Sequence, residues 1–296
     1  GSEQLGRNIA EEFAKGYNSV LLENHGVVCG GKDLFGAFMS FETLDTCGRL
    51  EIDAAKLGKP RLLTDEEIEI DASIGSPRLD EFIPNTVSSE ERAARRDLCT
   101  IIHRAYDQKL FTSTQGTFSM RLSDGSFLIT PYKQDRKYLE PEDIVRIKGG
   151  MCEMGKNPSR ATRLHEEIYR THPDINSIIS AHPPAIMAFA VTDAAFDART
   201  IPESYILLRD VKTLPYEEIY REPDKMAEEF DVSHPVAIVE NDCVIVTGNS
   251  LLQAFDRLEV MELTANSILD SQSLGSIVHI SEAEIAELKT AFHLEG

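Results

Sequence analysis

Apolar residues change their spacing along the chain, and these changes predict where helices and strands lie. In the first region, apolar positions at helical spacing among charged residues predict a helix over residues 3–15. Two short apolar runs, at 19–23 and 26–29, predict strands on either side of an Asn-His-Gly break. A Gly-Gly-Lys-Asp turn at 30–33 then leads into a long predicted helix over 34–57, which ends near a glycine followed by a proline.

Residues 61–87 interrupt this regular pattern. They are acidic, and Gly75, Pro77 and Pro84 divide them into short pieces. We expect them to connect two domains, with one short helix beginning after Thr64.

From residue 88 onward, strand-like and helix-like patterns alternate. The first helix is predicted over 90–109, after a start that resembles a capping box. An Asp-Gly pair between two apolar runs predicts a hairpin of strands 116–122 and 126–130. Further strands are predicted at 145–147, 177–181, 205–208 and 211–214 and in a hairpin over 236–247, and further helices at 160–171, 185–192, 224–231, 250–270 and 281–292. This alternation favours a sheet with helices on both faces.

The two regions share a repeated pattern. Residues 22–26 (LENHG) correspond to residues 239–243 (VENDC), an offset of 217 that holds without a gap from residue 20 to residue 68. A period of this length indicates two domains rather than a solenoid. We therefore expect residues 1–60 to be the C-terminal part of a first domain, 61–87 to be a linker and 88–296 to be a complete second domain. The chain would then be a fragment of a longer two-domain protein.

The composition narrows the class of protein. With 42% hydrophobic and 27% charged residues, the chain resembles an ordinary globular protein, and no apolar run is long enough to span a bilayer. A formal net charge of −20 repels phosphate backbones and anionic lipid, so we expect neither a nucleic-acid nor a membrane partner. Five widely spaced cysteines without a Cys-x-x-Cys pair favour free thiols and a cytoplasmic protein.

Several motifs follow one another in a characteristic order. The first region carries LENHGVV before GGKDL, and the second carries GTFSMR at 116–121, FLITP at 127–131, LEPEDIV at 139–145 and PDINSIISAHPP at 173–184. Together these motifs resemble the class II aldolase/adducin family, which the second region matches along nearly its whole length. The resemblance implies an α/β fold, a three-layer α/β/α sandwich with a largely antiparallel central sheet.

The resemblance also implies a metal-dependent activity. Aldolases of this family bind a divalent metal, usually zinc, with two histidines of a His-x-His strand, a third histidine in an Asn-His-Gly turn, and a glutamate after a Ser-Ser pair as ligand or base. Alternate residues of a strand point to one face, so two such imidazoles can share a metal. The metal polarises the carbonyl and hydroxyl groups of the substrate while a carboxylate moves the proton. The implied function is an aldehyde lyase that acts on a sugar phosphate or a related hydroxy-carbonyl compound.

The second region departs from this metal set at three of its four positions. Ser180 and His182 occupy the His-x-His positions, Ala161 occupies the glutamate position, and Asp242 replaces the third histidine. Catalytic zinc sites usually have three protein ligands, so we expect His182 and Asp242 not to bind zinc firmly and the second domain to be a non-catalytic copy.

The first region keeps the Asn-His-Gly turn, and His25 is therefore its candidate metal ligand. We expect Zn²⁺ or another divalent metal to bind in the first domain only. A histidine that merely forms hydrogen bonds within the turn is the alternative interpretation of His25.

The family's phosphate-binding segments indicate candidate substrate-binding residues in the second region. These residues are Thr117, Thr130, Lys133, Ser159 and Arg160. Lys133 stands where the family has a glycine. Lys133 and Arg160 can bind an anion, or they can be ordinary loop charges on an acidic protein.

Two functions remain open. The first is a metal-dependent aldehyde lyase working through the first domain, with a small sugar phosphate as its substrate. The second is a non-catalytic, adducin-like assembly module or scaffold. Members of the family form rings with active sites at subunit borders, so the resemblance also implies a homo-oligomer.

Overall fold

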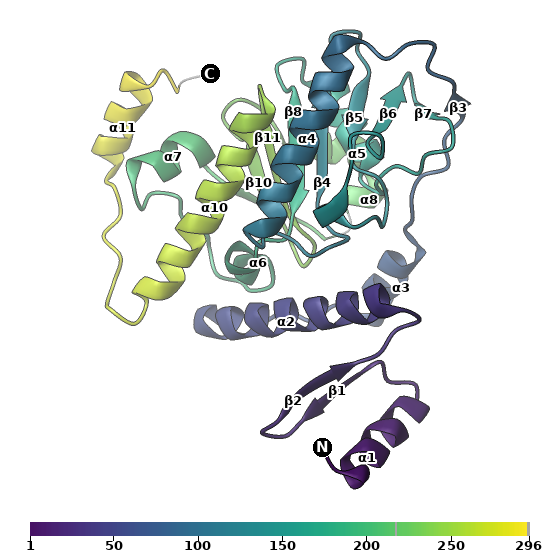
Figure 1. Ribbon diagram of the computed structural model, residues 1–296. Helices are drawn as coiled ribbons and strands as arrows, with labels where there is room; N and C mark the ends of the chain where they lie inside the picture. The colour runs from purple at the N-terminus through teal and green to yellow at the C-terminus, as the bar shows by residue number, and fades with distance from the viewer. Residues whose placement is uncertain (217, 295–296) are drawn as a thin grey trace. The chain divides into compact units, whose positions relative to one another are not determined.

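The computed structural model describes residues 1–216 and 218–294, and the chain divides into two compact units, Gly1–Leu50 and Glu51–Gly296. The boundary between the units lies within the long helix α2 (Leu34–Leu57). The predicted domain boundary at residue 60 lies further along the chain, just after the end of this helix. Figure 1 colours the chain from its N-terminus to its C-terminus and labels most of the helices and strands.

The first unit contains the predicted helix, hairpin and long helix. Helix α1 (Glu3–Ala14) precedes the antiparallel strands β1 (Ser19–Leu22) and β2 (Gly26–Cys29), and α2 follows. The side chain of Asp33 accepts a hydrogen bond of 2.7 Å from the backbone N–H of Gly36, which satisfies a free donor at the start of α2. The elements predicted for residues 3–57 are confirmed.

A nine-stranded sheet forms the centre of the second unit within the described residues, in the order β3-β7-β6-β5-β4-β8-β11-β10-β9. Its strands are β3 (Glu81–Phe82), β4 (Thr117–Arg121), β5 (Phe127–Ile129), β6 (Val145–Lys148), β7 (Met151–Glu153), β8 (Ser177–Ala181), β9 (Lys212–Leu214), β10 (Val236–Val239) and β11 (Val244–Gly248). Among the described strands, the two edge pairings, β3 with β7 and β9 with β10, are parallel, and the inner pairings are antiparallel. The predicted largely antiparallel sheet is confirmed.

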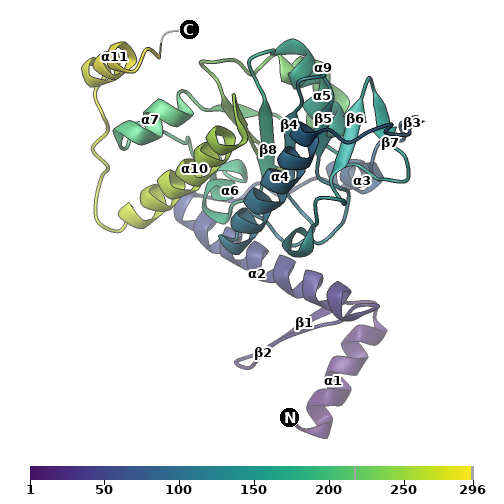
Figure 2. The same cartoon turned by 45° about the horizontal axis from the view of Figure 1, so that its top comes forward.

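Helices cover both faces of this sheet (Figure 1, Figure 2). One face carries α4 (Ser89–Asp107) and α10 (Leu251–Ser271), and the other carries α5 (Thr162–Thr171) and α9 (Pro223–Ala227). Phe127 and Ile129 alternate with Leu128 along β5, and they pack in one core cluster with Ile168 of α5. The three-layer sandwich follows from this alternation, since an inner strand such as β5 buries successive apolar side chains on opposite faces of the sheet. Among the described helices, none combines the length and the hydrophobicity that a bilayer-spanning segment needs.

Two short elements differ from the prediction. Residues 205–208 were expected to be a strand, but they belong to the helix α7 (Pro202–Leu208). A four-residue apolar run is too short to distinguish a buried helix from a strand, and Pro202 at the first turn favours the helix. The helix expected over 224–231 ends at Ala227, and α8 (Glu218–Arg221) lies before it. The remaining helices are α6 (Pro184–Ala190) and α11 (Glu282–Ala291), with a 3₁₀ turn at Arg136–Tyr138.

The segment 61–87 was expected to be a linker, but it is folded onto the second unit. It contains the helix α3 (Asp65–Ser73), capped by a reciprocal pair of hydrogen bonds between Thr64 and Glu67. Strand β3 extends the sheet by pairing with β7, and the N–H of Arg61 donates to the carbonyl of Val191 at 2.7 Å. Its prolines and glycine mark turns between these elements rather than a free connection.

The offset of 217 also relates local conformations. Asn24 and Asn241 occupy the turns of the two hairpins with φ angles of 53° and 54°. A Cβ placed on Gly31 would lie 2.3 Å from the backbone N of Ala37, and one on Gly248 would lie 2.7 Å from the backbone N of Ala254. Both glycines therefore allow the same close approach between the end of a hairpin and the start of a long helix.

Candidate functional site

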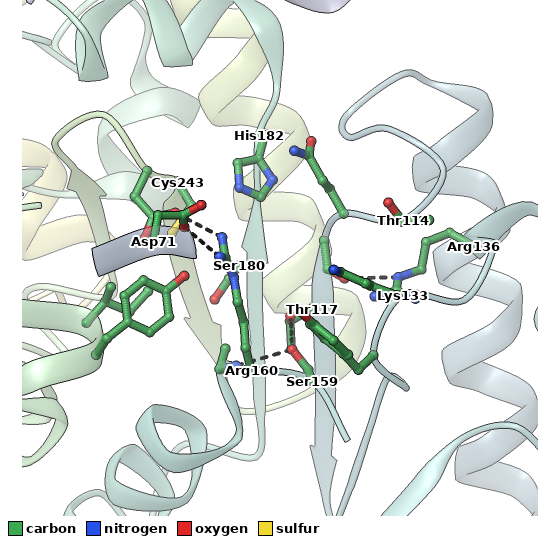
Figure 3. Close-up of a pocket in the computed structure, with 17 residues that line it drawn as sticks. Asp71, Thr114, Thr117, Lys133, Arg136, Ser159, Arg160, Ser180, His182 and Cys243 are labelled. Atoms are coloured by element: carbon green, nitrogen blue, oxygen red, sulfur yellow. Dashed lines mark hydrogen bonds and ion pairs between the residues drawn. The ribbon is translucent and has the colours of Figure 1, made fainter. Parts of the chain in front are cut away.

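A cavity of about 270 Å³ opens in the second unit where β4, β8 and β11 meet. The antiparallel register places Thr117, at the start of β4, opposite Ser180, near the end of β8. Val244, at the start of β11, lies opposite Ala181. Side chains from the start of β4, the end of β8 and the β10–β11 turn therefore converge on one pocket (Figure 3).

Six of the eight residues predicted from the sequence line this cavity. They are Thr117, Lys133, Ser159, Arg160, His182 and Asp242. Thr130 does not line it: the residue is 0% exposed, and its hydroxyl accepts a hydrogen bond of 3.3 Å from the N–H of Phe118 within the hairpin. His25 lies in the first unit, where it is exposed.

A pair of hydroxyl groups forms one side of the cavity. Thr117 Oγ1 and Ser159 Oγ lie 2.6 Å apart, and both residues are buried. The N–H of Ser159 donates to the carbonyl of Thr130 at 3.0 Å, and the N–H of Ala161 donates to Ser159 Oγ at 3.3 Å. These bonds fix the start of α5 against the sheet, so the hydroxyl pair sits beside a helix N-terminus.

Two cations lie near this hydroxyl pair. Arg136 is buried, and its Nε and Nη1 donate to the backbone carbonyls of Gly116 and Gln134 at 3.0 and 2.8 Å. Burial lowers the pKa of Arg136 to about 10, which leaves the guanidinium charged at neutral pH. Lys133 is exposed and has a φ angle of 52°, in the left-handed region that favours glycine. This conformation explains why the resembled family has a glycine at that position.

Arg160 forms the side of the cavity opposite the hydroxyl pair. The sequence did not indicate two of its partners, Asp71 and Tyr220. Its Nη1 donates to Asp71 Oδ1 at 2.6 Å, its Nη2 lies 3.9 Å from Asp242 Oδ1, and its guanidinium carbon lies 5.1 Å from the ring centroid of Tyr220. Burial opposes the charge, but Tyr220 and the two carboxylates outweigh it and raise the pKa of Arg160 above its ordinary value. Asp71 comes from α3, in the segment expected to be a linker, and the capping pattern at Thr64 predicted the helix without its location.

Two buried polar atoms in the pocket have no hydrogen-bond partner among the described residues: His182 Nδ1 and Asp242 Oδ2. Burial, together with the charge of Arg160, lowers the pKa of His182 to about 4, so its ring is neutral at neutral pH. Burial raises the pKa of Asp242 to about 6. Buried polar atoms are rarely left unpaired in folded proteins, so these two atoms favour a ligand at this position.

Ser180 belongs to a buried network beneath the cavity. Its Oγ lies 3.2 Å from His165 Nε2, and His165 Nδ1 lies 2.8 Å from Ser119 Oγ, which in turn lies 2.7 Å from the hydroxyl of Tyr169. Burial lowers the pKa of His165 to about 3, so the imidazole is neutral and bonds at both nitrogens. Ser180 is thus used structurally where the resembled family has a metal-binding histidine.

The donor set does not fit the family's metal. No group of three or more His, Cys, Asp or Glu side chains is placed to hold a metal ion in the described part of the chain. Ala161 offers no donor, and the charged guanidinium of Arg160 lies 3.9 Å from Asp242 and would repel a dication. Burial raises the pKa of the neighbouring Cys243 thiol well above its usual range, so no thiolate replaces the missing ligands.

The fold and these motifs define a class of protein, and the family comparison agrees. The chain belongs to the family of class II aldolase and adducin N-terminal domains, whose model matches residues 1–52 and 96–269. It is similar to a 3-oxo-tetronate 4-phosphate decarboxylase of Pectobacterium atrosepticum, with 28% identity over 69% of this chain and 95% of that protein. It is also similar to an L-fuculose phosphate aldolase of Methanococcus vannielii, with 28% identity over 56% of this chain and 91% of that protein.

Solved structures share this fold. An L-fuculose 1-phosphate aldolase superposes with a TM-score of 0.61 at 21% identity, over 70% of this chain and 97% of that one. YgbL from Escherichia coli superposes with a TM-score of 0.59 at 25% identity, over 67% of this chain and 99% of that one. The predicted class II aldolase-like fold is confirmed.

Proposed function

We propose that this chain is part of a sugar-phosphate lyase of the class II aldolase family, in which the pocket of the second unit binds a small phosphorylated hydroxy-carbonyl compound. The names of two relatives support the substrate class, since one is a decarboxylase of 3-oxo-tetronate 4-phosphate and the other an L-fuculose phosphate aldolase. The observation that carries the proposal is the hydroxyl pair of Thr117 and Ser159 beside two cations.

This side of the pocket has the chemistry that a phosphate requires. The hydroxyl of Ser159, just before α5, and that of Thr117, on β4, can donate to phosphate oxygens, and the dipole of α5 favours an anion there. Arg136 is a buried cation whose bonds of 3.0 and 2.8 Å go to backbone carbonyls instead of a carboxylate, so its charge remains available to a ligand. Lys133 adds a second positive charge at the rim.

The proposal assigns binding, and no zinc-dependent cleavage, to the second unit. This assignment is supported by Ser180, Ala161 and Asp242, which replace three of the family's four metal ligands. A non-catalytic, adducin-like assembly role is the second candidate for this unit, and the same substitutions favour it. The two candidates differ in ligand binding, because only the first requires an occupied pocket.

The lyase chemistry and any Zn²⁺ are assigned to a first domain that includes His25. The matching turns at Asn24 and Asn241 support a duplicated fold. In the second unit Phe255 of α10 is 0% exposed, whereas its counterpart Phe38 of α2 is 42% exposed. An uncovered aromatic face on α2 is the surface that a second aldolase-like sheet would cover. A homo-oligomer and a cytoplasmic location complete the proposal, and the five free cysteines, all in described residues, suit a reducing compartment.

Calorimetric titration with inorganic phosphate tests the phosphate site. Wild type should bind one phosphate per chain. Ser159→Ala and Thr117→Val should each weaken binding by about tenfold, since each removes a hydroxyl that donates to a charged ligand. Ser267→Ala is the matched control, because the hydroxyl of Ser267 is exposed on α10 and bonds only its own helix. Equal affinity in Ser159→Ala and wild type, or no binding by wild type, would overturn the proposed site.

A further inference from the structure

The side of the pocket opposite the hydroxyl pair carries a fixed cation that the phosphate proposal does not use. Arg160 extends past Ser180 towards Asp71, on the side of the pocket where His182 lies (Figure 3). Asp71 holds one end of the guanidinium at 2.6 Å, and the ring of Tyr220 supports its face at 5.1 Å. The charge is therefore held in place before any ligand arrives.

The Arg160 guanidinium lies beside the positions of the family's metal ligands. The four positions that would carry the family's metal ligands are occupied by Ser180, His182, Ala161 and Asp242, and Arg160 Nη2 lies 3.9 Å from Asp242 Oδ1. A guanidinium so close to one of these positions supplies a positive charge where a dication would otherwise stand. The planar group has five N–H donors, and Asp71 engages one of its terminal nitrogens, so donors remain for a ligand oxygen.

The unpaired atoms of the pocket lie around the same charge. Asp242 is 9% exposed, and its Oδ2 is an acceptor without a partner among the described residues. His182 Nδ1 is buried and equally unpaired there. A hydroxyl group can donate to the carboxylate oxygen, and it can also bond the neutral ring, which removes the cost of leaving both atoms unsatisfied.

We propose that the Arg160 guanidinium replaces a divalent metal as the cationic group of this pocket, and that it binds the carbonyl or carboxylate oxygen of a vicinal hydroxy-carbonyl ligand whose hydroxyl contacts Asp242 and His182. This inference deepens the function proposed above, since it identifies the group that holds the unphosphorylated end of the ligand. It does not depend on the phosphate site, because its contacts are on the other side of the cavity.

Asp71 has a defined role in this arrangement. Its carboxylate occupies Arg160 at 2.6 Å with 46% of its side chain exposed, so it competes with an anionic ligand oxygen for the same cation. A ligand must share or displace this contact. Removal of the Asp71 charge should therefore strengthen anion binding, whereas removal of the Arg160 charge should abolish it.

The test is equilibrium dialysis of the full chain with radiolabelled glycolate, a compound that has a hydroxyl next to a carboxylate. Wild type should bind glycolate equally in excess EDTA and in zinc chloride. Arg160→Gln should weaken binding by at least about tenfold, Arg160→Lys should recover part of the loss, and Asp71→Asn should strengthen binding by about threefold to tenfold. Arg163→Gln is the matched control, since Arg163 is exposed on α5, the helix that follows Arg160, and does not line the cavity.

Opposite signs for Asp71→Asn and Arg160→Gln keep the test independent of folding, because a misfolded variant cannot gain affinity. Glycolate binding that EDTA abolishes and zinc restores, with one zinc per chain by elemental analysis, would overturn the proposal. Unchanged glycolate affinity in Arg160→Gln would overturn it as well. Loss of phosphate binding alone in Ser159→Ala concerns only the other side of the pocket, so the two proposals can fail separately.

Discussion

Gly248 lies where the end of β11 meets the start of α10, and an added methyl group there should destabilise the second unit. A Cβ at this position would lie 2.7 Å from Ala254 N, 2.9 Å from Ser250 O and 3.2 Å from Ala254 Cα. All three atoms belong to the backbone, so no side-chain rotation can relieve the overlap. The helix start must move away from the strand that forms part of the pocket.

The expected magnitude follows from the cost of overpacking. Extra atoms forced into a packed site usually cost about 1–3 kcal/mol, and contacts to backbone place Gly248→Ala near the upper end, at about 2–3 kcal/mol. For a domain of this size, each kcal/mol corresponds to a shift in Tm of about 2–4 °C. We therefore expect Tm to fall by about 5–10 °C.

Scanning calorimetry and urea unfolding followed by circular dichroism measure this effect. Gly58→Ala is the matched control, since Gly58 has no atom within 4 Å of an added Cβ, and its stability should stay within about 0.5 kcal/mol of wild type. Gly31→Ala, at the equivalent position of the first unit, should destabilise that unit in the same way, because its Cβ would lie 2.3 Å from Ala37 N. Wild-type stability in Gly248→Ala would show that the turn relaxes freely and would refute the argument.

Two further predictions concern strain and pH. Lys133→Gly should raise the free energy of unfolding by about 0.5–1 kcal/mol in urea titrations, because it relieves a φ of 52°. The same substitution should weaken phosphate binding. A lower free energy of unfolding in this variant would contradict the strain argument. The depressed pKa of His165, about 3 in the folded chain against an ordinary 6.5, gives stability that is present above pH 6.5 and is lost as pH falls towards 3. His165→Asn should therefore flatten the fall in urea stability between pH 6.5 and pH 4, by up to about 1.4 kcal/mol per pH unit, while the exposed-site control His293→Asn should not.

Local patterns predicted the parts of the fold that depend on local physics. The hairpins, the long helices and the strand at 177–181 have a clear period or a turn signal, and all appear where expected. The run at 205–208 had neither, and it is part of α7, where Tyr205 and Leu208, three positions apart, are the buried apolar residues. The segment 61–87 has the composition of a linker, and the contacts that order it, such as the pairing of β3 with β7, are long-range and leave no local pattern in the sequence.

The candidate site likewise has features that local sequence indicates and contacts that are long-range. Motif order located six of the eight predicted residues in one cavity, since aligned positions of a shared fold converge. Thr130 does not line the cavity, because its hydroxyl turns inward to the N–H of Phe118, and nothing in the motif indicates which way this side chain points. The pairing of Arg160 with Asp71 joins residues 89 positions apart, and no local pattern reports such a contact.

The second unit is proposed to bind a sugar phosphate without a metal. Calorimetric titration of the full chain with L-fuculose 1-phosphate in excess EDTA tests it directly. We expect one ligand per chain and the same affinity after EDTA is replaced by zinc chloride. No binding in EDTA, followed by binding once zinc is added, would contradict it.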